Sequence, residues 1–154
     1  ATNMAQALSV MKGGAAGQGL SGTAHSAGAT WSSGAGLDAA VPTIVFHGDH
    51  DQTVHPSNGE QVVAAVLSAS ASQQVGRASG ARIEQGRTGA GMPFTRALHT
   101  DASGDVVVEH WLLHGAGHAW SGGRPEGSYA AASGPDASRE MLRFFFEHPR
   151  ARGQ

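Results

Sequence analysis

Apolar residues recur along the first half of the chain at two different spacings, one typical of a strand and one of a helix. Residues 41–46 form a short β-branched and aromatic run that stops at Gly48, and such a run predicts a buried strand. Within residues 59–70, three valines and a leucine fall at spacings of one, three and four, which predicts a helix with one apolar face. A strand followed by a short loop and a helix predicts an α/β unit.

Two further strands and a second helix are expected in the second half of the chain. Residues 94–100 alternate between apolar and polar, and residues 106–113 form the strongest strand pattern, with a short polar turn between the two. A final helix is expected to have Pro135 in its first turn and Asp136 near its positive end, and to stop before Pro149. Its apolar face is expected to contain Met141, Leu142, Phe144, Phe145 and Phe146.

Three other segments carry little of this pattern. Residues 3–12 predict a short helix that stops at two glycines. Residues 13–37 contain almost no large apolar side chain, and residues 71–91 are polar and glycine-rich, so both are expected to be loops. A loop as long as residues 13–37 is uncommon inside a compact domain and tends to be functional or disordered. Residues 1–150 are therefore interpreted as one domain and residues 151–154 as a tail.

The composition excludes several classes of protein. A length of 154 residues fits one ordinary domain, and a net charge of −2 provides no basic field for binding nucleic acid. The absence of cysteine excludes disulfides, thiolate chemistry and cysteine-ligated zinc. No apolar run approaches the roughly 20 residues needed to cross a bilayer, so no membrane partner is expected. The chain starts without Met or a signal-peptide pattern, which suggests a processed or truncated product.

The residues best suited to chemistry follow the two strongest strands. Asp51 comes just after residues 41–46, and His118 follows residues 106–113 in the glycine-rich stretch GAGHAWSGG. Ligands and catalytic side chains in open α/β sheets gather beyond the carboxyl ends of strands. A carboxylate there can orient an imidazole, which can then deprotonate a hydroxyl nucleophile. Asp49 and Asp51 could equally be turn residues, and Trp120 could line a pocket or cover the core.

A metal site is the less favoured use of the histidines. The three that recur every four residues would face one way on a helix, but their segment is β-branched and broken by glycines. In a strand the first two would share a face and stand two pleats apart. His110 is therefore expected to be a sheet residue and His114 a residue at the strand end. Arg96 and Arg143 are expected to be solvated charges. The histidines in question are His110, His114 and His118, with a second cluster at His47, His50 and His55.

Three stretches together resemble the poly(3-hydroxybutyrate) depolymerase-like esterases, a family of α/β-hydrolases that also includes feruloyl-type esterases. They are PTIVFHGDHDQTVHPSNGEQV, EHWLLHGAGHAWSGG and GPDASREMLRFFFEHPR, in that order. The resemblance extends over most of residues 1–150 and corresponds to the C-terminal half of the family. It implies half of a three-layer α/β-hydrolase fold, a mostly parallel sheet with helices on both faces.

The resemblance also implies a serine esterase that cleaves carboxylic esters without a metal or organic cofactor. By this resemblance Asp51 is the acid and His118 the base of a Ser-Asp-His triad. If Trp120 lines the pocket, it is the candidate substrate-binding residue. The nucleophile elbow is not recognisable, because the motifs around Ser21 and Ser26 each lack a required glycine and neither follows an apolar strand. We therefore expect the serine to lie outside this chain and the chain alone to be inactive.

The expected partners follow from this interpretation. They are a polyester or small-ester substrate, and either an N-terminal fragment of the same protein or a second copy of the chain that covers the open side of strand 42–47. The resemblance favours an extracellular, secreted protein. The alternative hypothesis, from a different class, is a non-catalytic polymer- or saccharide-binding module that uses the same loops for recognition.

Overall fold

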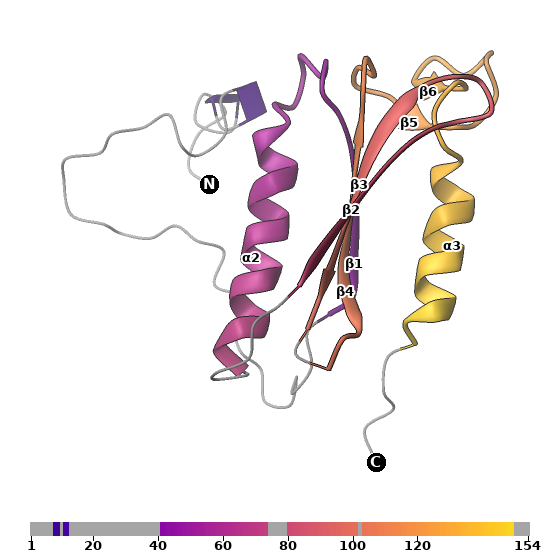
Figure 1. Cartoon of the computed structure of the whole chain (residues 1–154). Coiled ribbons are helices and arrows are strands. Elements are labelled where there is room, and N and C mark those ends of the chain that lie inside the picture. Colours follow the sequence, from indigo (N-terminus) through magenta and orange to yellow (C-terminus); the bar gives the residue numbers. More distant parts are fainter. Residues whose placement is uncertain (1–7, 10, 13–40, 74–79, 102, 150–154) are drawn as a thin grey trace.

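The computed structural model describes residues 8–9, 11–12, 41–73, 80–101 and 103–149 (Figure 1). Of the helix expected at residues 3–12, the four described residues are helical. The loop expected at residues 13–37 and the tail at 151–154 lie outside the described residues. The elements in chain order are β1 (Thr43–Gly48), α2 (Ser57–Gln73), β2 (Ala81–Arg87), β3 (Pro93–Thr100), β4 (Val106–Leu113), β5 (Trp120–Ser121), β6 (Ala130–Ala131) and α3 (Ala137–Glu147).

The main sheet is mixed, with strand order β1-β4-β3-β2. Within this sheet β1 and β4 pair in parallel, whereas β4 with β3 and β3 with β2 are antiparallel. A separate two-stranded sheet pairs β5 with β6 in parallel. The expected mostly parallel sheet with helices on both faces, half of an α/β-hydrolase three-layer fold, is therefore wrong. The connections explain the difference, because short turns join β2 to β3 and β3 to β4, and short turns produce antiparallel neighbours. A single short helix lies on each side of the sheet, α2 and α3 (Figure 1).

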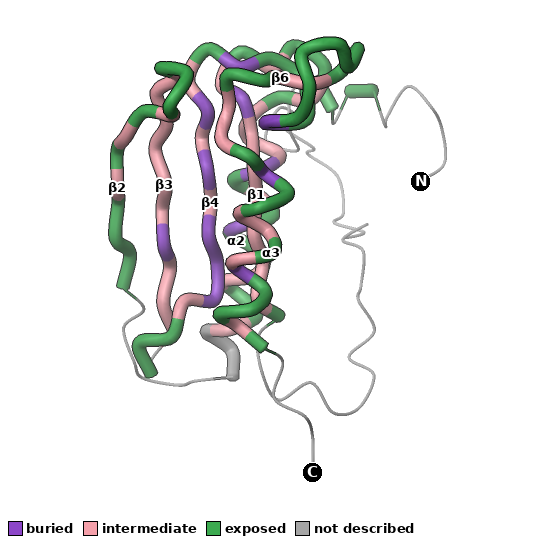
Figure 2. Tube along the Cα trace, turned by 90° about the vertical axis from the view of Figure 1, so that its right-hand side faces the viewer, coloured by how far each residue is buried: buried purple, intermediate pink, exposed green. Residues whose placement is uncertain are grey.

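The strand β2 was not expected, because residues 71–91 have a polar and glycine-rich pattern. Its residues are mostly exposed, and Ile83 is 58% exposed. Figure 2 shows the same contrast, with buried residues concentrated in β4 and exposed ones in β2 at the edge of the sheet. β2 is therefore held by pairing along its whole length with β3 rather than by burial of its own side chains.

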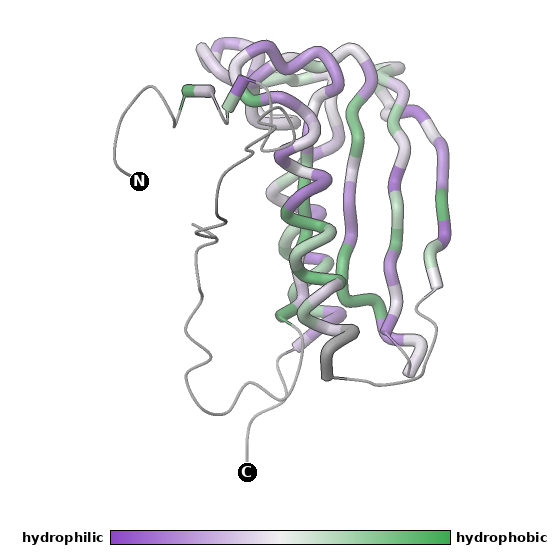
Figure 3. The backbone as a smooth tube through the Cα atoms, turned by 90° about the vertical axis from the view of Figure 1, so that its left-hand side faces the viewer, coloured by the Kyte–Doolittle hydropathy of each residue, from purple (hydrophilic) through white to green (hydrophobic). Residues whose placement is uncertain are grey.

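The helix α2 packs on the sheet as its apolar spacing predicted. Val63 is buried against Val107 and Val108 of β4, with Val45 of β1 and further α2 residues around them. The observed helix starts two residues before the predicted range 59–70 and ends three residues after it. Figure 3, which views the molecule from this side, shows hydrophobic and hydrophilic segments alternating along α2. The helix thus covers β1 and β4. These two strands pair in parallel, so their carboxyl ends lie together.

The helix α3 begins after the N-cap residue Asp136, whose side chain accepts a hydrogen bond from the Arg139 amide at 3.0 Å. Pro135 therefore lies just before the N-cap rather than in the first turn. The predicted broad apolar face is wrong in extent, because Phe144 is fully buried while Phe145 and Phe146 are 48% and 81% exposed. Helical spacing places only one of three consecutive phenylalanines against the sheet.

Arg96 and Arg143 are not the solvated charges that the sequence suggested. Both donate hydrogen bonds to Glu109 of β4, which is only 1% exposed, at 2.9 and 2.6 Å. The indole of Trp111 donates a third hydrogen bond to the same carboxylate at 2.6 Å. Burial raises the pKa of Glu109, but the hydrogen bonds from Arg96, Arg143 and Trp111 outweigh it, and the pKa is lowered. The ion pair with Arg143 ties α3 to the sheet.

The strand β1 lies at one edge of the sheet, and no second strand pairs with it among the described residues. Because β1 and β4 are parallel, the loops that follow them leave the sheet at the same end. The candidate site lies at this end. None of the helices in the described part of the chain is long and apolar enough to cross a membrane.

Candidate active site

The loops after β1 and β4 are joined by backbone hydrogen bonds. The amide of Asp49 donates to the carbonyl of Leu113 at 3.1 Å, and the amide of His50 donates to the carbonyl of Ala116 at 3.0 Å. At Gly48 the two backbones approach so closely that a Cβ would lie 2.2 Å from the carbonyl oxygen of Ala116. A glycine at this position is what allows the two loops to meet.

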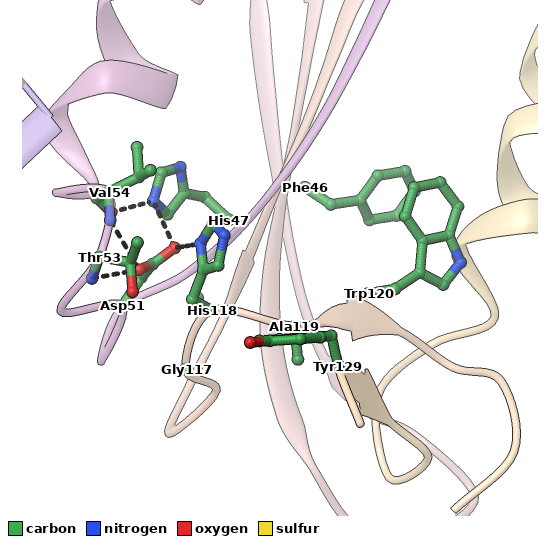
Figure 4. A pocket seen from close by; sticks show the side chains of 11 residues that line it. Phe46, His47, Asp51, Thr53, Val54, Gly117, His118, Ala119, Trp120 and Tyr129 are labelled. Carbon is green, nitrogen blue, oxygen red and sulfur yellow. Dashed lines mark hydrogen bonds and ion pairs between the residues drawn. The ribbon is translucent and has the colours of Figure 1, made fainter. Parts of the chain in front are cut away.

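Asp51 and His118 are in contact across these two loops. Oδ2 of Asp51 lies 2.8 Å from Nδ1 of His118, within the 2.6–3.2 Å expected for such a pair (Figure 4). The Asp51 side chain is 7% exposed, whereas that of His118 is 50% exposed. The contact predicted from the sequence is therefore present, and the catalytic roles of the two residues stay a prediction.

The remaining oxygen of Asp51 is held by its own loop. Oδ1 accepts hydrogen bonds from the amides of Thr53 and Val54, each at 2.8 Å. Burial raises the pKa of Asp51, but the hydrogen bonds from Val54, His118 and Thr53 lower it by more, so that the pKa lies below its ordinary value. An ionised carboxylate can only accept, so Nδ1 of His118 carries the proton and Nε2 of the neutral ring is left as the basic nitrogen.

His47 supports the Asp51 loop from the end of β1. Its Nε2 atom lies 2.8 Å from the carbonyl oxygen of Val54, to which it donates, and 3.6 Å from Oδ2 of Asp51. This histidine was noted in the sequence only as part of a cluster. Its contacts with Val54 and Asp51 stabilise the turn that contains the Asp51 carboxylate.

A second carboxylate–imidazole contact lies beside the first and was not predicted. Oδ2 of Asp49 lies 2.9 Å from Nδ1 of His114, and Nε2 of the same ring lies 2.9 Å from Oγ1 of Thr95. Burial raises the pKa of Asp49, but hydrogen bonds from His114 and from the Gly115 amide lower it by more. His114 is at the end of β4, as expected, and Asp49 is therefore more than a simple turn residue. The sequence signal was the pair of aspartates two residues apart facing a pair of histidines four residues apart.

The Asp51–His118 pair opens into a cavity of about 740 Å³. In Figure 4 the pair lies on one side of the cavity, and the rings of Phe46 and Trp120 lie on the other. Trp120 is 53% exposed and Tyr129 is 76% exposed, and the Trp120 amide donates to the Tyr129 carbonyl at 2.7 Å. Of the two interpretations of Trp120, the structure favours the pocket over a cover for the core. Phe46 and Tyr129 were not predicted, because a strand residue and an isolated loop tyrosine carry no distinctive motif.

The histidines of the two sequence clusters are spread over different parts of the site. His110 lies within β4 with a buried Nε2 atom, His114 and His118 contact different aspartates, and the 73% exposed side chain of His50 lies 3.9 Å from Asp49. Within the described ranges, no group of three or more His, Asp or Glu side chains is arranged to hold a metal ion.

The candidate nucleophiles dismissed in the sequence, Ser21 and Ser26, lie outside the described residues. A scan of the chain against protein-family models finds no match, and a search of curated proteins finds none either. The esterase resemblance therefore remains an interpretation of three sequence stretches, and the case for function depends on the geometry of the site.

Proposed function

We propose that the chain contributes the acid and the base of a serine-dependent carboxylic ester hydrolase, with Asp51 as the acid and His118 as the base. The observation that carries the proposal is the contact between the buried, ionised carboxylate of Asp51 and Nδ1 of the half-exposed His118. This contact leaves Nε2 as the basic nitrogen of a ring that lines the cavity. Among the described residues, no group forms a hydrogen bond with that Nε2 atom.

In the proposed reaction, Nε2 of His118 takes the proton of a serine hydroxyl as the oxygen attacks the ester carbonyl. The imidazolium that forms is stabilised by the Asp51 carboxylate, and it then gives the proton to the departing alcohol. A water molecule attacks the resulting acyl-enzyme by the same route, which releases the acid and restores the serine. The aromatic wall formed by Phe46, Trp120 and Tyr129 suits an apolar or aromatic part of a polyester or small ester.

The serine is proposed to come from outside this chain, either from an N-terminal fragment of the same protein or from a second copy. Two features support such a partner. The edge strand β1 has no neighbour on its outer side within the described part of the chain, and unpaired parallel edges are association sites. On α3, Leu142 and Phe145 are 61% and 48% exposed. These two side chains are three residues apart, so they lie on the same face of the helix.

The alternative proposal is a non-catalytic polymer- or saccharide-binding module. It is favoured by the exposure of Trp120 and Tyr129, because exposed aromatic rings beside a cavity are a common platform for flat, weakly polar ligands. On this alternative, Asp51 and His118 would serve only to hold the two loops together.

A fluorophosphonate probe, which reacts with activated serines, separates the two proposals. The sequence encoded upstream of Ala1 is first examined for a G-x-S-x-G motif after an apolar strand, and the longer protein is then labelled. We expect one labelled serine in the longer protein and loss of labelling in His118→Ala. The matched control His50→Ala, which removes an exposed imidazole from the same loops, should label normally. An unlabelled protein that still binds polyester or polysaccharide would favour the binding module and contradict the hydrolase.

A further inference from the structure

A hydroxyl, an imidazole and a carboxylate form a second chain of contacts that the proposed reaction does not use. Thr95 contacts Nε2 of His114 at 2.9 Å, and Nδ1 of His114 contacts Asp49 at 2.9 Å. The other oxygen of Asp49 accepts a hydrogen bond from the amide of Gly115 at 2.7 Å. We call Thr95, His114 and Asp49 the clamp, because together they link β3, the end of β4 and the loop after β1.

The position of the clamp is unsuited to a second reaction centre. Thr95 lies within β3, between Gln85 of β2 and Leu112 of β4, so strands flank it on both sides. None of the three clamp residues lines the cavity that contains His118. A nucleophilic hydroxyl needs space for a substrate and donors for the developing oxyanion, whereas Thr95 has a paired strand on each side.

The clamp instead holds the base of the loop that presents His118. Only three residues separate His114 from His118, and they are Gly115, Ala116 and Gly117. Gly115 has a φ of +82°, a left-handed conformation. Glycine adopts positive and negative φ about equally readily, so the residue alone does not fix this conformation. The Asp49 carboxylate fixes His114 and Gly115, the first two residues of this loop. One oxygen contacts the His114 ring, and the other accepts a hydrogen bond from the Gly115 amide. The hydroxyl of Thr95 contacts Nε2 of His114 and so restricts rotation of the ring.

We propose that Asp49, His114 and Thr95 are positioning residues that keep Nδ1 of His118 directed at Asp51. His118 is half exposed, so packing alone does not fix its ring. Without the clamp, the glycine-rich loop samples other conformations, and the neutral ring loses its preference for the Nδ1–H tautomer. The catalytic consequence rests on the proposed hydrolase, whereas the tautomer is a property of this chain alone.

The tautomer of His118 can be read directly from two-bond ¹H–¹⁵N correlations of the imidazole rings in the ¹⁵N-labelled 154-residue chain. The spectra are taken at increasing pH until the ring ¹⁵N shifts no longer change, so that only the neutral form is observed. We expect His118 to be predominantly Nδ1–H in the wild type. In Asp51→Asn the side-chain oxygen stays on the Thr53 and Val54 amides, so the amide NH2 faces His118 and donates, and His118 should shift toward Nε2–H.

The decisive variant is Asp49→Ala, which does not touch His118 and removes the acceptor of both the His114 ring and the Gly115 amide. We expect it to shift His118 as well as His114 toward Nε2–H, whereas Asp51→Asn should shift His118 and leave His114 unchanged. His55→Ala serves as the matched control and should shift neither ring, because the exposed ring of His55 contacts Ser57. Dispersed amide signals from β3 and β4 show that each variant is folded, and Thr95→Val replaces Asp49→Ala if the latter is not.

A folded Asp49→Ala protein in which His114 shifts while His118 keeps its Nδ1–H tautomer would overturn the proposal. In the complete hydrolase, the same variant is expected to lower kcat with little change in KM, since the clamp does not touch substrate. Thr95→Ser, which keeps the hydroxyl, should retain more activity than Thr95→Val. If no hydrolase activity exists, the tautomer result still decides whether the clamp positions His118.

Discussion

Nδ1 of His118 lies 2.8 Å from Oδ2 of Asp51, although the two are 67 positions apart in the sequence. Parallel pairing of β1 and β4 brings these residues together, because it places the ends of both strands at one edge of the sheet. The carboxylate is buried and anchored by two backbone amides, while the imidazole faces the cavity. This asymmetry is what an acid–base pair requires, since the acid must stay ionised and the base must reach a substrate.

Substitution of Gly48 tests the close approach of the two loops. In Gly48→Ala, the new Cβ would meet the backbone of Ala116 at 2.2 Å, so the loops must separate. We expect a loss of about 1–3 kcal/mol in the free energy of unfolding, typical of forced overpacking, measured by urea denaturation. Gly89→Ala is the matched control, because a Cβ there meets nothing within 4 Å, and its stability should change by less than about 0.5 kcal/mol. Equal stability of the two variants would contradict the close contact.

Substitution of Glu109 tests the buried ion-pair network. Glu109→Gln leaves two arginines beside a neutral, buried amide, and breaking such a network costs about 3–5 kcal/mol of unfolding free energy. Glu84→Gln removes a partly exposed partner of Arg96 and should cost no more than about 1 kcal/mol. Chemical denaturation of both variants gives the comparison. A small effect at Glu109 would mean that α3 is held mainly by Phe144.

The partly buried histidine His110 makes stability depend on pH. Burial lowers its pKa below the ordinary 6.5, while the unfolded chain takes up the proton at its ordinary value. Below about pH 6.5 the unfolded state therefore binds more protons, and stability falls as pH decreases, by up to about 1.4 kcal/mol per pH unit. Urea denaturation at several pH values should show a smaller slope in His110→Phe than in the wild type. Part of the slope should remain, because burial lowers the pKa of His99 as well. An unchanged slope would mean that His110 titrates normally in the folded chain.

The sequence predicted the elements that carry the site better than it predicted the sheet. Apolar runs located β1 and β4, and the residues directly after them supplied Asp51 and His118. Strand pairing, by contrast, depends on connection lengths and on partners that no local pattern reveals. The segment that forms β2 was interpreted as a loop because it is polar and glycine-rich, and its pairing with β3 could not be seen in the sequence.

The contacts that the sequence could not predict involve polar residues distant along the chain. Arg96 and Arg143 are charged side chains of the kind that is usually solvated. Only the fold shows that both form ion pairs with Glu109. The Thr95–His114 contact likewise joins two strands through side chains that have no shared motif. Patterns of apolar spacing report which face of an element is buried, but they do not report which polar groups meet there.

The chain alone is expected to be inactive toward esters. A base without an activated hydroxyl, and without donors for the oxyanion, lacks the first chemical step. We expect hydrolysis of p-nitrophenyl butyrate by the isolated chain to stay at the buffer rate. Turnover that disappears in Ser21→Ala or in Ser26→Ala would show that one of these dismissed serines is a nucleophile.

The central claim, that Asp51 and His118 act as an acid–base pair, is tested most directly by turnover in the longer, serine-containing protein. The measurement is kcat for p-nitrophenyl butyrate in the wild type, in Asp51→Asn and in the control His50→Ala. Loss of the carboxylate leaves the imidazole in the wrong tautomer, so kcat in Asp51→Asn should fall by about 10⁴-fold, while His50→Ala should match the wild type. If Asp51→Asn keeps kcat within about tenfold of the wild type, Asp51 is not the acid of this site.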